Sequence, residues 1–364
     1  MPAVGLVCDV DTSNNSAGSF CMSRYDDYSY NARPSRFNSP RRSKDRPDFS
    51  QATVGMVVGV DRGRITCVYP IDVPHDDQVT VTAVKARELG RKGVVIGDRV
   101  RLVGDLSGKT DTLARLVEIV DRESVLLRTA DDSDPVERNI VANADQMAIV
   151  VAAANPEPRL GLIDRALVAA YDGKLDPILV ITKTDLADPQ AILDNYVGLD
   201  IRHVLIDQKT GKGVSEFRDL LLGHMTVLIG HSGVGKSTLV NSIIPHADRA
   251  TGVVNDVTGR GKHTSTSAIA FPLPNDVGWV IDTPGIRSFG LAHVNAETII
   301  DYFPELEDGT ANCPRACTHV SSTGSAPPDC ALDEFVNSGS AGSAGASRLA
   351  SMRRLLTALH NPST

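Results

Sequence analysis

The chain has 364 residues, of which 41% are hydrophobic and 23% are charged, and its formal net charge is −8. This length allows two or three domains with packed cores. No apolar run approaches the length of a membrane-spanning helix, so we expect no membrane contact. The acidic balance argues against indiscriminate nucleic-acid binding, although local basic patches matter more than the total.

Residues 1–50 are expected to form a disordered, basic N-terminal extension. Arg33–Arg46 carries six basic residues, one acid and two prolines, which is too polar to fold alone. It is either a solubilising tail or an arm that folds onto RNA phosphates, and we favour RNA because a second RNA-binding candidate follows. Residues 1–21 carry no motif. Either they extend this disordered segment, or Met22 is the true start and they are no part of the natural protein.

Residues 51–127 are predicted to form a small β-barrel of the oligonucleotide-binding type, because five short strand-like runs alternate with turns. The predicted strands are Val54–Val60, Arg64–Tyr69, Gln78–Val84, Arg99–Val103 and Ala114–Val120. Basic residues fall at turns and in a loop, as an RNA-facing rim requires: Arg62, Arg64, Lys85, Arg87, Arg91 and Lys92. A barrel with only a structural role is the alternative.

Residues 128–290 change to alternating strand and helix patterns, which predict a doubly wound α/β domain with its sites at the strand carboxyl ends. The predicted strands are Met147–Ala153, Pro177–Ile181, Arg202–Ile206, Met225–Ile229 and the run that begins at Val280. The predicted helices are Leu160–Tyr171, Gly213–Leu222 with Ser215 as its cap, and Ser237–Ile244.

The string GHSGVGKS at 230–237 fits the phosphate-binding loop pattern G-x-x-x-x-G-K-[ST] between a strand and a helix. Backbone N–H groups of such a loop cradle polyphosphate oxygens. Lys236 would reach the β- and γ-phosphates, and the Ser237 hydroxyl would bind Mg²⁺. A glycine-rich turn that matches by chance is the alternative. The residues expected to bind the phosphates are Gly230, His231, Ser232, Gly233, Val234, Gly235, Lys236, Ser237 and Thr238.

Two further strings indicate a guanine nucleotide. In TKTD, from Thr182 and Lys183 to Thr184 and Asp185, the Asp185 carboxylate would accept the N1–H and amine of guanine, while the Lys183 stem covers the base. In DTPG at 282–285, Asp282 would hold Mg²⁺ through water and the Gly285 N–H would touch the γ-phosphate. Alone, TKTD is equally a solvated strand end with a helix N-cap at Asp185. Three motifs that each end an apolar strand are hard to explain by accident.

The order of the motifs is unusual. In an ordinary GTPase the phosphate loop precedes the base-reading motif, whereas here TKTD precedes GHSGVGKS and DTPG follows. The sequence therefore predicts a circularly permuted P-loop GTPase domain, which is tolerable because domain termini usually lie close together at the surface.

Residues 291–364 are predicted to form a zinc-binding, helical C-terminal domain. Three thiols and one imidazole in the spacing C-x₃-C-x-H-x₁₀-C suit one structural zinc ion: Cys313, Cys317, His319 and Cys330. Disulfides or unrelated buried thiols are the alternatives, and a reducing cytosol disfavours disulfides. Helices are predicted at Ala296–Tyr302 and Arg348–Leu359, with a flexible loop over residues 338–347.

Barrel, permuted GTPase and Cys/His segment, in this order, resemble the ribosome small-subunit-dependent GTPase family (RsgA). The resemblance covers about Asn31 to Leu359. It implies a monomeric, cytoplasmic GTPase that uses Mg²⁺ and one zinc ion and acts late in assembly of the small ribosomal subunit. The resemblance also implies that the small subunit and its rRNA are the binding partners, that the subunit stimulates GTP hydrolysis, and that the enzyme leaves after hydrolysis. The family's switch element resembles GKHTST at 261–266, where Thr264, Ser265 or Thr266, and by preference Thr266, would complete the Mg²⁺ shell.

Three details qualify this resemblance. Ile286 stands where many GTPases carry a water-orienting glutamine, so the catalytic group must come from elsewhere, with the ribosome as a candidate. Asp207 and Gln208 stand where a Ser-Ala element usually supports guanine, and residues 321–328 lengthen the last zinc spacing. Two other functions remain open: a GTPase of another RNA pathway such as tRNA modification, and a non-hydrolysing scaffold that senses GTP.

Overall fold

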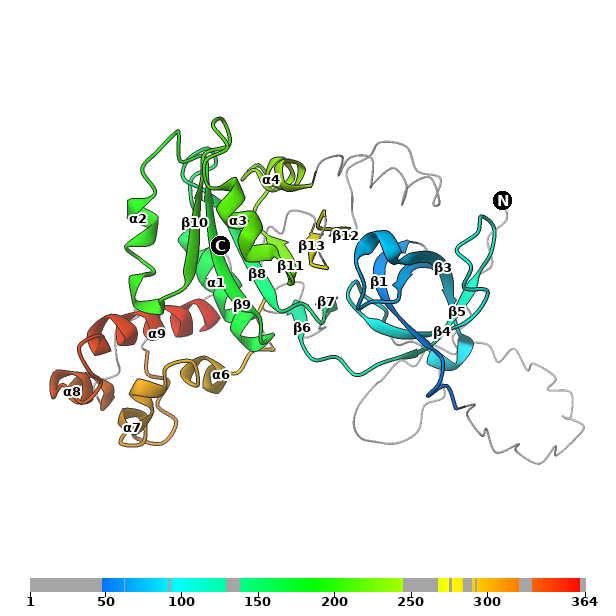
Figure 1. Ribbon diagram of the computed structural model, residues 1–364. Helices are drawn as coiled ribbons and strands as arrows, with labels where there is room; N and C mark the ends of the chain where they lie inside the picture. The colour runs from blue at the N-terminus through cyan, green and yellow to red at the C-terminus, as the bar shows by residue number, and fades with distance from the viewer. Residues whose placement is uncertain are drawn as a thin grey trace, which may run out of the picture. The chain divides into compact units, whose positions relative to one another are not determined.

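The computed structural model describes residues 48–61, 63–90, 93–128, 138–244, 268–274, 277–283, 290–291, 293–320 and 329–360. They form a closed barrel, a six-stranded sheet with helices, and a helical C-terminal segment (Figure 1). The basic extension before Asp48, the GKHTST segment, Gly285, Ile286 and residues 321–328 lie outside the described residues.

The barrel has the five predicted strands and closes in the order β1-β2-β3-β5-β4. Its strands are β1 (Thr53–Asp61), β2 (Arg64–Tyr69), β3 (Val79–Lys85), β4 (Arg99–Gly104) and β5 (Ala114–Ile119), with short 3₁₀ turns at His75–Asp77 and Arg87–Leu89. Alternate side chains fill its interior, among them Cys67, Val81 and Leu116. Of the predicted rim residues, Arg64 and Arg87 are exposed and Lys85 is half-buried, whereas Arg62, Arg91 and Lys92 are not described.

The sheet has the strand order β10-β9-β8-β11-β13-β12. Its parallel strands are β8 (Gln146–Ala152), β9 (Asp176–Thr182), β10 (Arg202–Ile206), β11 (Met225–Ile229) and β13 (Trp279–Asp282), and β12 (Ile269–Pro272) is antiparallel to β13. A hairpin of β6 (Val125–Arg128) and β7 (Arg138–Ala142) forms a separate sheet that the sequence pattern did not predict. The predicted α/β architecture is confirmed, and the carboxyl ends of β9, β10, β11 and β13 share one edge.

Helices cover both faces of the sheet because successive strand residues point to opposite sides. Ile149 and Val151 join the core beneath helix α1, and Ala148 and Val150 join the core beneath helices α3 and α4. These helices are α1 (Leu160–Asp172), α3 (Val214–Leu221) and α4 (Lys236–Ile243), with short α2 (Gln190–Leu193) and the turn Val197–Leu199 near β10.

The predicted cap of α3 is wrong. Gly213, with φ of +81°, is the N-cap residue of α3. Ser215 lies exposed in the first turn of the helix instead. The left-handed backbone at Gly213 starts the helix two residues earlier than a serine cap would, and side-chain preferences at caps do not reveal such a turn.

The C-terminal segment contains α6 (Ala296–Ile300), the 3₁₀ turn Pro304–Leu306, α7 (Glu307–Thr310), α8 (Leu332–Asn337) and α9 (Gly345–His360). Helix α9 begins at Gly345, inside the stretch 338–347 predicted as a flexible loop, because its small residues tolerate a helix that packs closely on Ala341. It lies on α1 through an Arg354–Asp164 ion pair of 3.0 Å. None of the helices in the described part of the chain has the length and apolar character needed to cross a membrane.

Candidate functional site

The phosphate loop joins β11 to α4 at the carboxyl edge of the sheet. Gly230 is buried, and a Cβ there would lie 2.3 Å from the Val150 carbonyl oxygen, so no side chain fits. Gly235 has φ of +98° and caps α4, a conformation that glycine adopts without strain. Ser232, Gly233, Ser237 and Thr238 are exposed around this turn. The strand–loop–helix setting that the motif requires is therefore present.

Lys236 and Asp282 face each other across this loop. Lys236 is 7% exposed, and its Nζ donates to the Gly230 carbonyl at 2.7 Å. Burial lowers the pKa of Lys236, and the Asp282 carboxylate partly offsets this effect. Burial likewise raises the pKa of Asp282, against the Lys236 charge. The buried Lys236 and the half-buried Asp282 thus place opposite charges at the same strand–loop edge.

The residues predicted to hold Mg²⁺ fit a hard cation. Asp282 ends β13, and its Oδ1 atom is buried without a hydrogen-bond partner among the described residues. A buried carboxylate oxygen needs a donor or a cation, and Mg²⁺ prefers oxygen ligands. Ser237 stands in the first turn of α4, one residue after Lys236.

 The TKTD segment lies against the phosphate loop, although Thr182 and Val234 are 52 positions apart in the chain. The Thr182 hydroxyl donates to the Val151 carbonyl at 3.1 Å and to the Val234 carbonyl in the phosphate loop at 2.5 Å. The Lys183 ammonium donates to the Gly233 carbonyl at 2.8 Å and to the Asn155 carbonyl. The fold therefore brings the two motifs into direct contact.

Asp185 lies at the open end of this segment. No helix begins at Asp185, since the next one, α2, starts at Gln190, so the N-cap alternative is not supported. The Asp185 side chain is 15% exposed, and its carboxylate pairs with the Lys209 ammonium at 2.6 Å. That pairing raises the pKa of Lys209. A carboxylate in this position can accept two N–H donors of a ligand.

The structure also assigns contacts that the motifs did not indicate. Gln208 Nε2 donates to the Gly235 carbonyl at 3.1 Å, and Asn155 supplies a carbonyl to Lys183. The sequence placed Gln208 next to the guanine loop but gave no sign of a bond to the phosphate loop. Gly285 and Thr266, which were expected near the γ-phosphate, lie outside the described residues.

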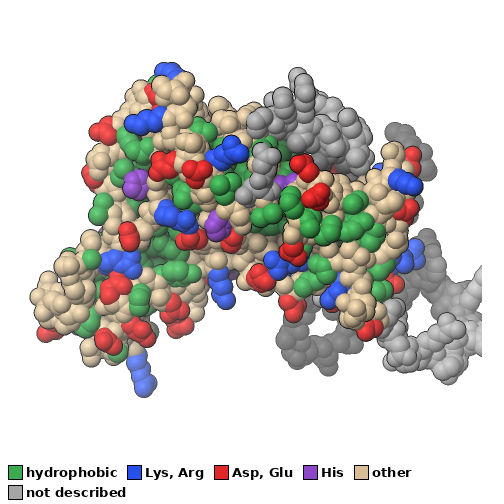
Figure 2. Space-filling model, in the orientation of Figure 1, with side chains coloured by type: hydrophobic (Ala, Val, Ile, Leu, Met, Phe, Trp, Pro, Cys, Tyr) green, Lys and Arg blue, Asp and Glu red, His purple; other side chains and the backbone are tan. Residues whose placement is uncertain are grey.

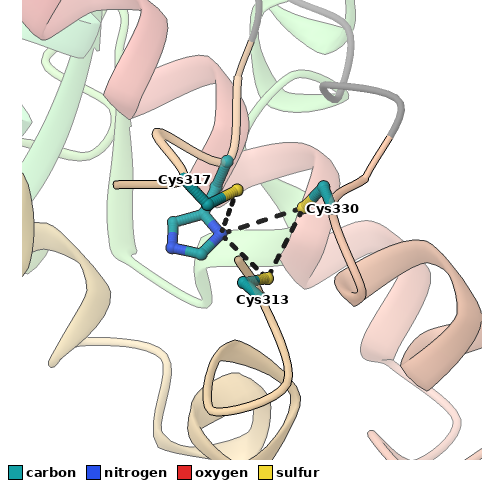
Figure 3. Close-up of side chains that lie close together, drawn as sticks. Cys313, Cys317 and Cys330 are labelled. Carbon is teal, nitrogen blue, oxygen red and sulfur yellow. Dashed lines mark hydrogen bonds between the residues drawn. The ribbon is translucent and has the colours of Figure 1, made fainter. Parts of the chain in front are cut away.

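The C-terminal cysteines and histidine converge as predicted (Figure 3). The His319 Nδ1 atom lies 3.6 Å, 3.7 Å and 3.8 Å from the sulfurs of Cys313, Cys317 and Cys330, and two of the sulfurs are 4.0 Å apart. Zn–S bonds of about 2.3 Å and Zn–N bonds of about 2.0 Å give a tetrahedron with edges of about 3.5–3.8 Å. The four ligand atoms therefore fit one zinc ion, and the disulfide alternative finds no support because all three thiols are free.

Arg353 of α9 supports this cluster from outside. It donates to the His319 carbonyl at 3.2 Å and to the Cys330 sulfur at 3.7 Å, while Asp333 holds its guanidinium at 2.6 Å. Three thiolates and one neutral imidazole around Zn²⁺ leave one negative charge, which a guanidinium offsets. Burial raises the pKa of the Cys313 thiol to about 11, so a metal ion is needed to keep that sulfur ionised.

The fold and the site together define a class of protein. A P-loop after β11, a guanine-type TKTD motif after the earlier strand β9 and an acidic strand end at β13 are the parts of a P-loop GTPase in permuted order. A family model described as RsgA GTPase matches residues 119–292.

Relatives and solved structures agree with this class. The chain is 39% identical to the small ribosomal subunit biogenesis GTPase RsgA of Ectopseudomonas mendocina over 227 residues, which span 60% of this chain and 63% of that protein. It is 34% identical to the protein of the same name from Chlorobaculum parvum over 268 residues, which cover 71% of this chain and 84% of the relative. The chain belongs to the RsgA GTPase family.

Two solved structures share the architecture. The crystal structure of YjeQ from Thermotoga maritima matches with a TM-score of 0.58 at 26% identity, over 84% of this chain and 98% of that one. The structure of YloQ, described as a circularly permuted GTPase, matches with a TM-score of 0.55 at 22% identity, over 82% of this chain and 92% of that one. The second likeness concerns the fold alone.

Proposed function

We propose that the protein hydrolyses GTP to GDP and phosphate in late assembly of the small ribosomal subunit, and that this subunit stimulates hydrolysis and releases the enzyme afterwards. The observation that carries the proposal is the direct contact of the TKTD segment with the phosphate loop in permuted order, in a member of the RsgA family. Relatives that bear the name small ribosomal subunit biogenesis GTPase support the choice of partner.

Different residues of the site would bind the phosphates, the guanine base and Mg²⁺. The backbone of the loop from Gly230 to Thr238 would bind the phosphates, Lys236 would contact their non-bridging oxygens, and Asp185 would read guanine. Ser237 and Asp282 would hold Mg²⁺, which when bound neutralises charge on the β- and γ-phosphates. The burial of Lys236 strengthens its attraction for phosphate, because a charge removed from water interacts more strongly with an opposite charge.

Gly285 and Thr266 are proposed to sense the γ-phosphate. Ile286 offers no polar group to orient water, so we propose that the ribosomal subunit supplies or positions that group. We further propose one structural zinc ion per chain at Cys313, Cys317, His319 and Cys330, because the donor set and the distances between the ligand atoms fit it.

The remaining parts would serve binding to the subunit. We propose a basic arm at 1–50, an RNA-binding barrel at 51–127, the GTPase domain at 128–290 and the zinc-binding domain at 291–364, in a monomer that works in the cytoplasm. Figure 2 shows acidic and basic side chains interspersed on the visible face. With a net charge of −8, RNA binding would depend on local basic groups such as Arg64 and Arg87.

Single-turnover GTP hydrolysis with and without purified small subunits tests the proposal. We expect stimulation of roughly tenfold or more by small subunits, since groups supplied by a partner often raise phosphoryl-transfer rates strongly. Large subunits and bulk tRNA serve as controls. Co-sedimentation with small subunits in the presence of a GTP analogue should accompany the effect. Stimulation by tRNA alone would favour another RNA pathway, and absence of hydrolysis under all conditions would favour a GTP-sensing scaffold.

A further inference from the structure

The loop after β10 is held in a fixed shape by its first residue. The Asp207 carboxylate accepts the backbone N–H groups of Lys209 at 2.8 Å and Thr210 at 3.2 Å, and the Thr210 hydroxyl at 2.7 Å. The Asp207 N–H donates to the Lys212 carbonyl at 3.1 Å. These hydrogen bonds, of which the one from the Thr210 hydroxyl has the largest effect, lower the pKa of Asp207 and favour its ionised carboxylate. The loop thus enters the nucleotide site already ordered.

The next side chain leaves this loop and contacts the phosphate loop. Gln208 Nε2 donates to the Gly235 carbonyl at 3.1 Å, and a Cβ on Gly235 would lie 2.5 Å from the same atom, so the amide rests directly on the glycine. The Gly235 carbonyl also accepts the N–H of Leu239 at 2.9 Å, which is the first hydrogen bond of α4. Gln208 therefore holds the helix end whose free N–H groups face the phosphates.

The same loop touches the carboxylate that would read the base. Lys209, adjacent to Gln208, pairs with Asp185 at 2.6 Å. On the other side, Lys183 donates to the Gly233 carbonyl at 2.8 Å. Two side chains, Lys183 and Gln208, thus connect the base-reading segments to Gly233 and Gly235 of the phosphate loop.

We infer that Gln208 is a positioning residue that couples guanine recognition to the phosphate-binding end of α4. The inference rests on the proposed function, because it takes a guanine nucleotide as the ligand. A nucleotide engages both halves of the site at once, so fixing the two halves relative to each other lowers the cost of binding the whole molecule. A ligand that uses only one half gains nothing from the link.

The experiment compares three probes on the full chain: GDP, guanosine and inorganic tripolyphosphate. Gln208→Met keeps the size of the side chain and removes the donor. We expect it to weaken GDP by about 2- to 12-fold, the range of one net hydrogen bond, with changes of less than about twofold for guanosine and tripolyphosphate. Gln208→Asn, whose amide is one carbon too short, should behave in the same way and serves as the second variant should Gln208→Met fold poorly.

Gln190→Met is the matched control. Gln190 donates through the same amide atom to Asp194 at 2.7 Å on the short helix α2, so this variant removes an equivalent bond outside the site. It should bind all three probes as the wild type does. Unchanged GDP binding in both Gln208 variants overturns the coupling. Equal losses for GDP and tripolyphosphate also overturn it, because Gln208 would then only shape the phosphate loop. A wild-type chain that fails to bind GDP overturns the proposed function instead.

Discussion

Lys236 carries the most heavily desolvated positive charge of the phosphate loop. Its ammonium donates to the Gly230 carbonyl at 2.7 Å and reaches the His231 carbonyl at 3.5 Å, and burial lowers its pKa. A neutral donor would satisfy either carbonyl oxygen, so these two contacts do not explain why a charged side chain stands here. Asp282 only partly offsets the burial of this charge, so we expect a polyanion to stabilise it further.

We therefore expect Lys236→Ala to weaken GTP binding by roughly 30-fold or more, because a buried, charged hydrogen-bond partner of the phosphates is lost. The melting temperature of the nucleotide-free protein should stay within a few degrees of the wild type, since the removed charge was itself costly to bury. Titration calorimetry and thermal melts measure both. Lys109→Ala, an exposed lysine of the barrel, is the control. Full GTP affinity in Lys236→Ala would contradict the assignment of the loop.

Asp185 is expected to select the base. Asp185→Asn should lower the preference for guanine over xanthine nucleotides by roughly 100-fold or more, because two hydrogen bonds to a charged acceptor are lost and the amide can pair with the C2 carbonyl of xanthine. Competition of GDP and XDP against a fluorescent nucleotide measures the ratio. Asp188→Asn changes a neighbouring carboxylate that accepts the N–H of Gln190 at 3.0 Å, and it should leave the ratio unaltered. A wild-type ratio in Asp185→Asn would exclude base reading by this residue.

The sequence motifs pointed to Lys236 and Asp185 as candidate site residues, but they gave no sign of contacts between residues that lie far apart in the chain. Lys236 and Asp185 stand at fixed offsets from a strand end, so a short string suffices to find them. Gln208 contacts a residue 27 positions away, and Arg353 contacts one 34 positions away. Such pairs form only after the sheet has brought distant loops together, and no local pattern records them.

At the scale of elements, α9 fastens the C-terminal segment to α1. The Arg354 guanidinium pairs with the buried Asp164 at 3.0 Å and stacks 4.6 Å from the centre of the Tyr196 ring. Burial raises the pKa of Asp164, although Arg354 opposes this shift. This ion pair therefore joins α9 to α1, although its two residues are 190 positions apart in the chain.

Arg354→Met should destabilise the protein by about 3 kcal/mol at neutral pH, because it leaves a buried carboxylate without its counter-charge. A raised folded pKa means that the ionised carboxylate costs stability as the pH rises through it. The loss caused by Arg354→Met should therefore shrink at acidic pH, where Asp164 takes up a proton. Denaturant unfolding at two pH values measures this effect.

Arg202→Met provides the control for this prediction. Arg202 pairs with Asp176 between β10 and β9, but the two side chains are 42% and 65% exposed. An exposed pair contributes about 0–1 kcal/mol, so this variant should stay close to the wild type. If the two arginine variants lost the same free energy of unfolding, burial of the Arg354–Asp164 pair would not increase its contribution to stability.

The Cys/His cluster is expected to stabilise the C-terminal segment by binding zinc. We expect about one zinc ion per chain, and a lower melting temperature after chelation, because the cluster ties the chain after α7 to the chain before α8. Arg353→Met should weaken zinc binding roughly 10- to 100-fold, since it removes a group that supports the ligands from outside. Cys67→Ala, which alters a thiol buried in the barrel, should keep the full zinc content. Metal-free protein of undiminished stability would refute a structural zinc ion.

Most strands and the helix α1 were predicted well, whereas some short strands and the start of one long helix were not. Strand β10 has the predicted limits, and α1 differs by one residue, because both carry strong apolar periodicity. The hairpin of β6 and β7 and the start of α9 at Gly345 were missed. Small residues such as those before Arg348 fit a loop and a helix equally, so packing on Ala341 decides between them.

At the scale of the whole molecule, we expect the nucleotide state to control binding to the small subunit. A non-hydrolysable GTP analogue should favour binding and GDP should weaken it, by roughly 5–150-fold for a typical coupling of ~1–3 kcal/mol. Linkage is reciprocal, so the subunit should tighten the analogue relative to GDP by the same factor. Sedimentation titrations with each nucleotide measure the first factor and nucleotide competition the second. Equal affinity of the subunit for both states would exclude the coupling even in an active GTPase.

Helix α1 connects the nucleotide site to the C-terminal segment, and this connection bears on the GTP-bound, GDP-bound and nucleotide-free states. The loop before it supplies the Asn155 carbonyl to Lys183, beside the base, and the helix itself carries α9 through Asp164 and through Arg165, which donates to the Ala358 carbonyl at 2.7 Å. GTP and GDP share the base and differ only at the γ-phosphate. We therefore expect the packed route through α1 to report whether the site is occupied, and the segments that contain Thr266 and Gly285 to report which nucleotide is bound. An emptied enzyme should be a third state, with a loosened zinc segment that neither nucleotide-bound form displays.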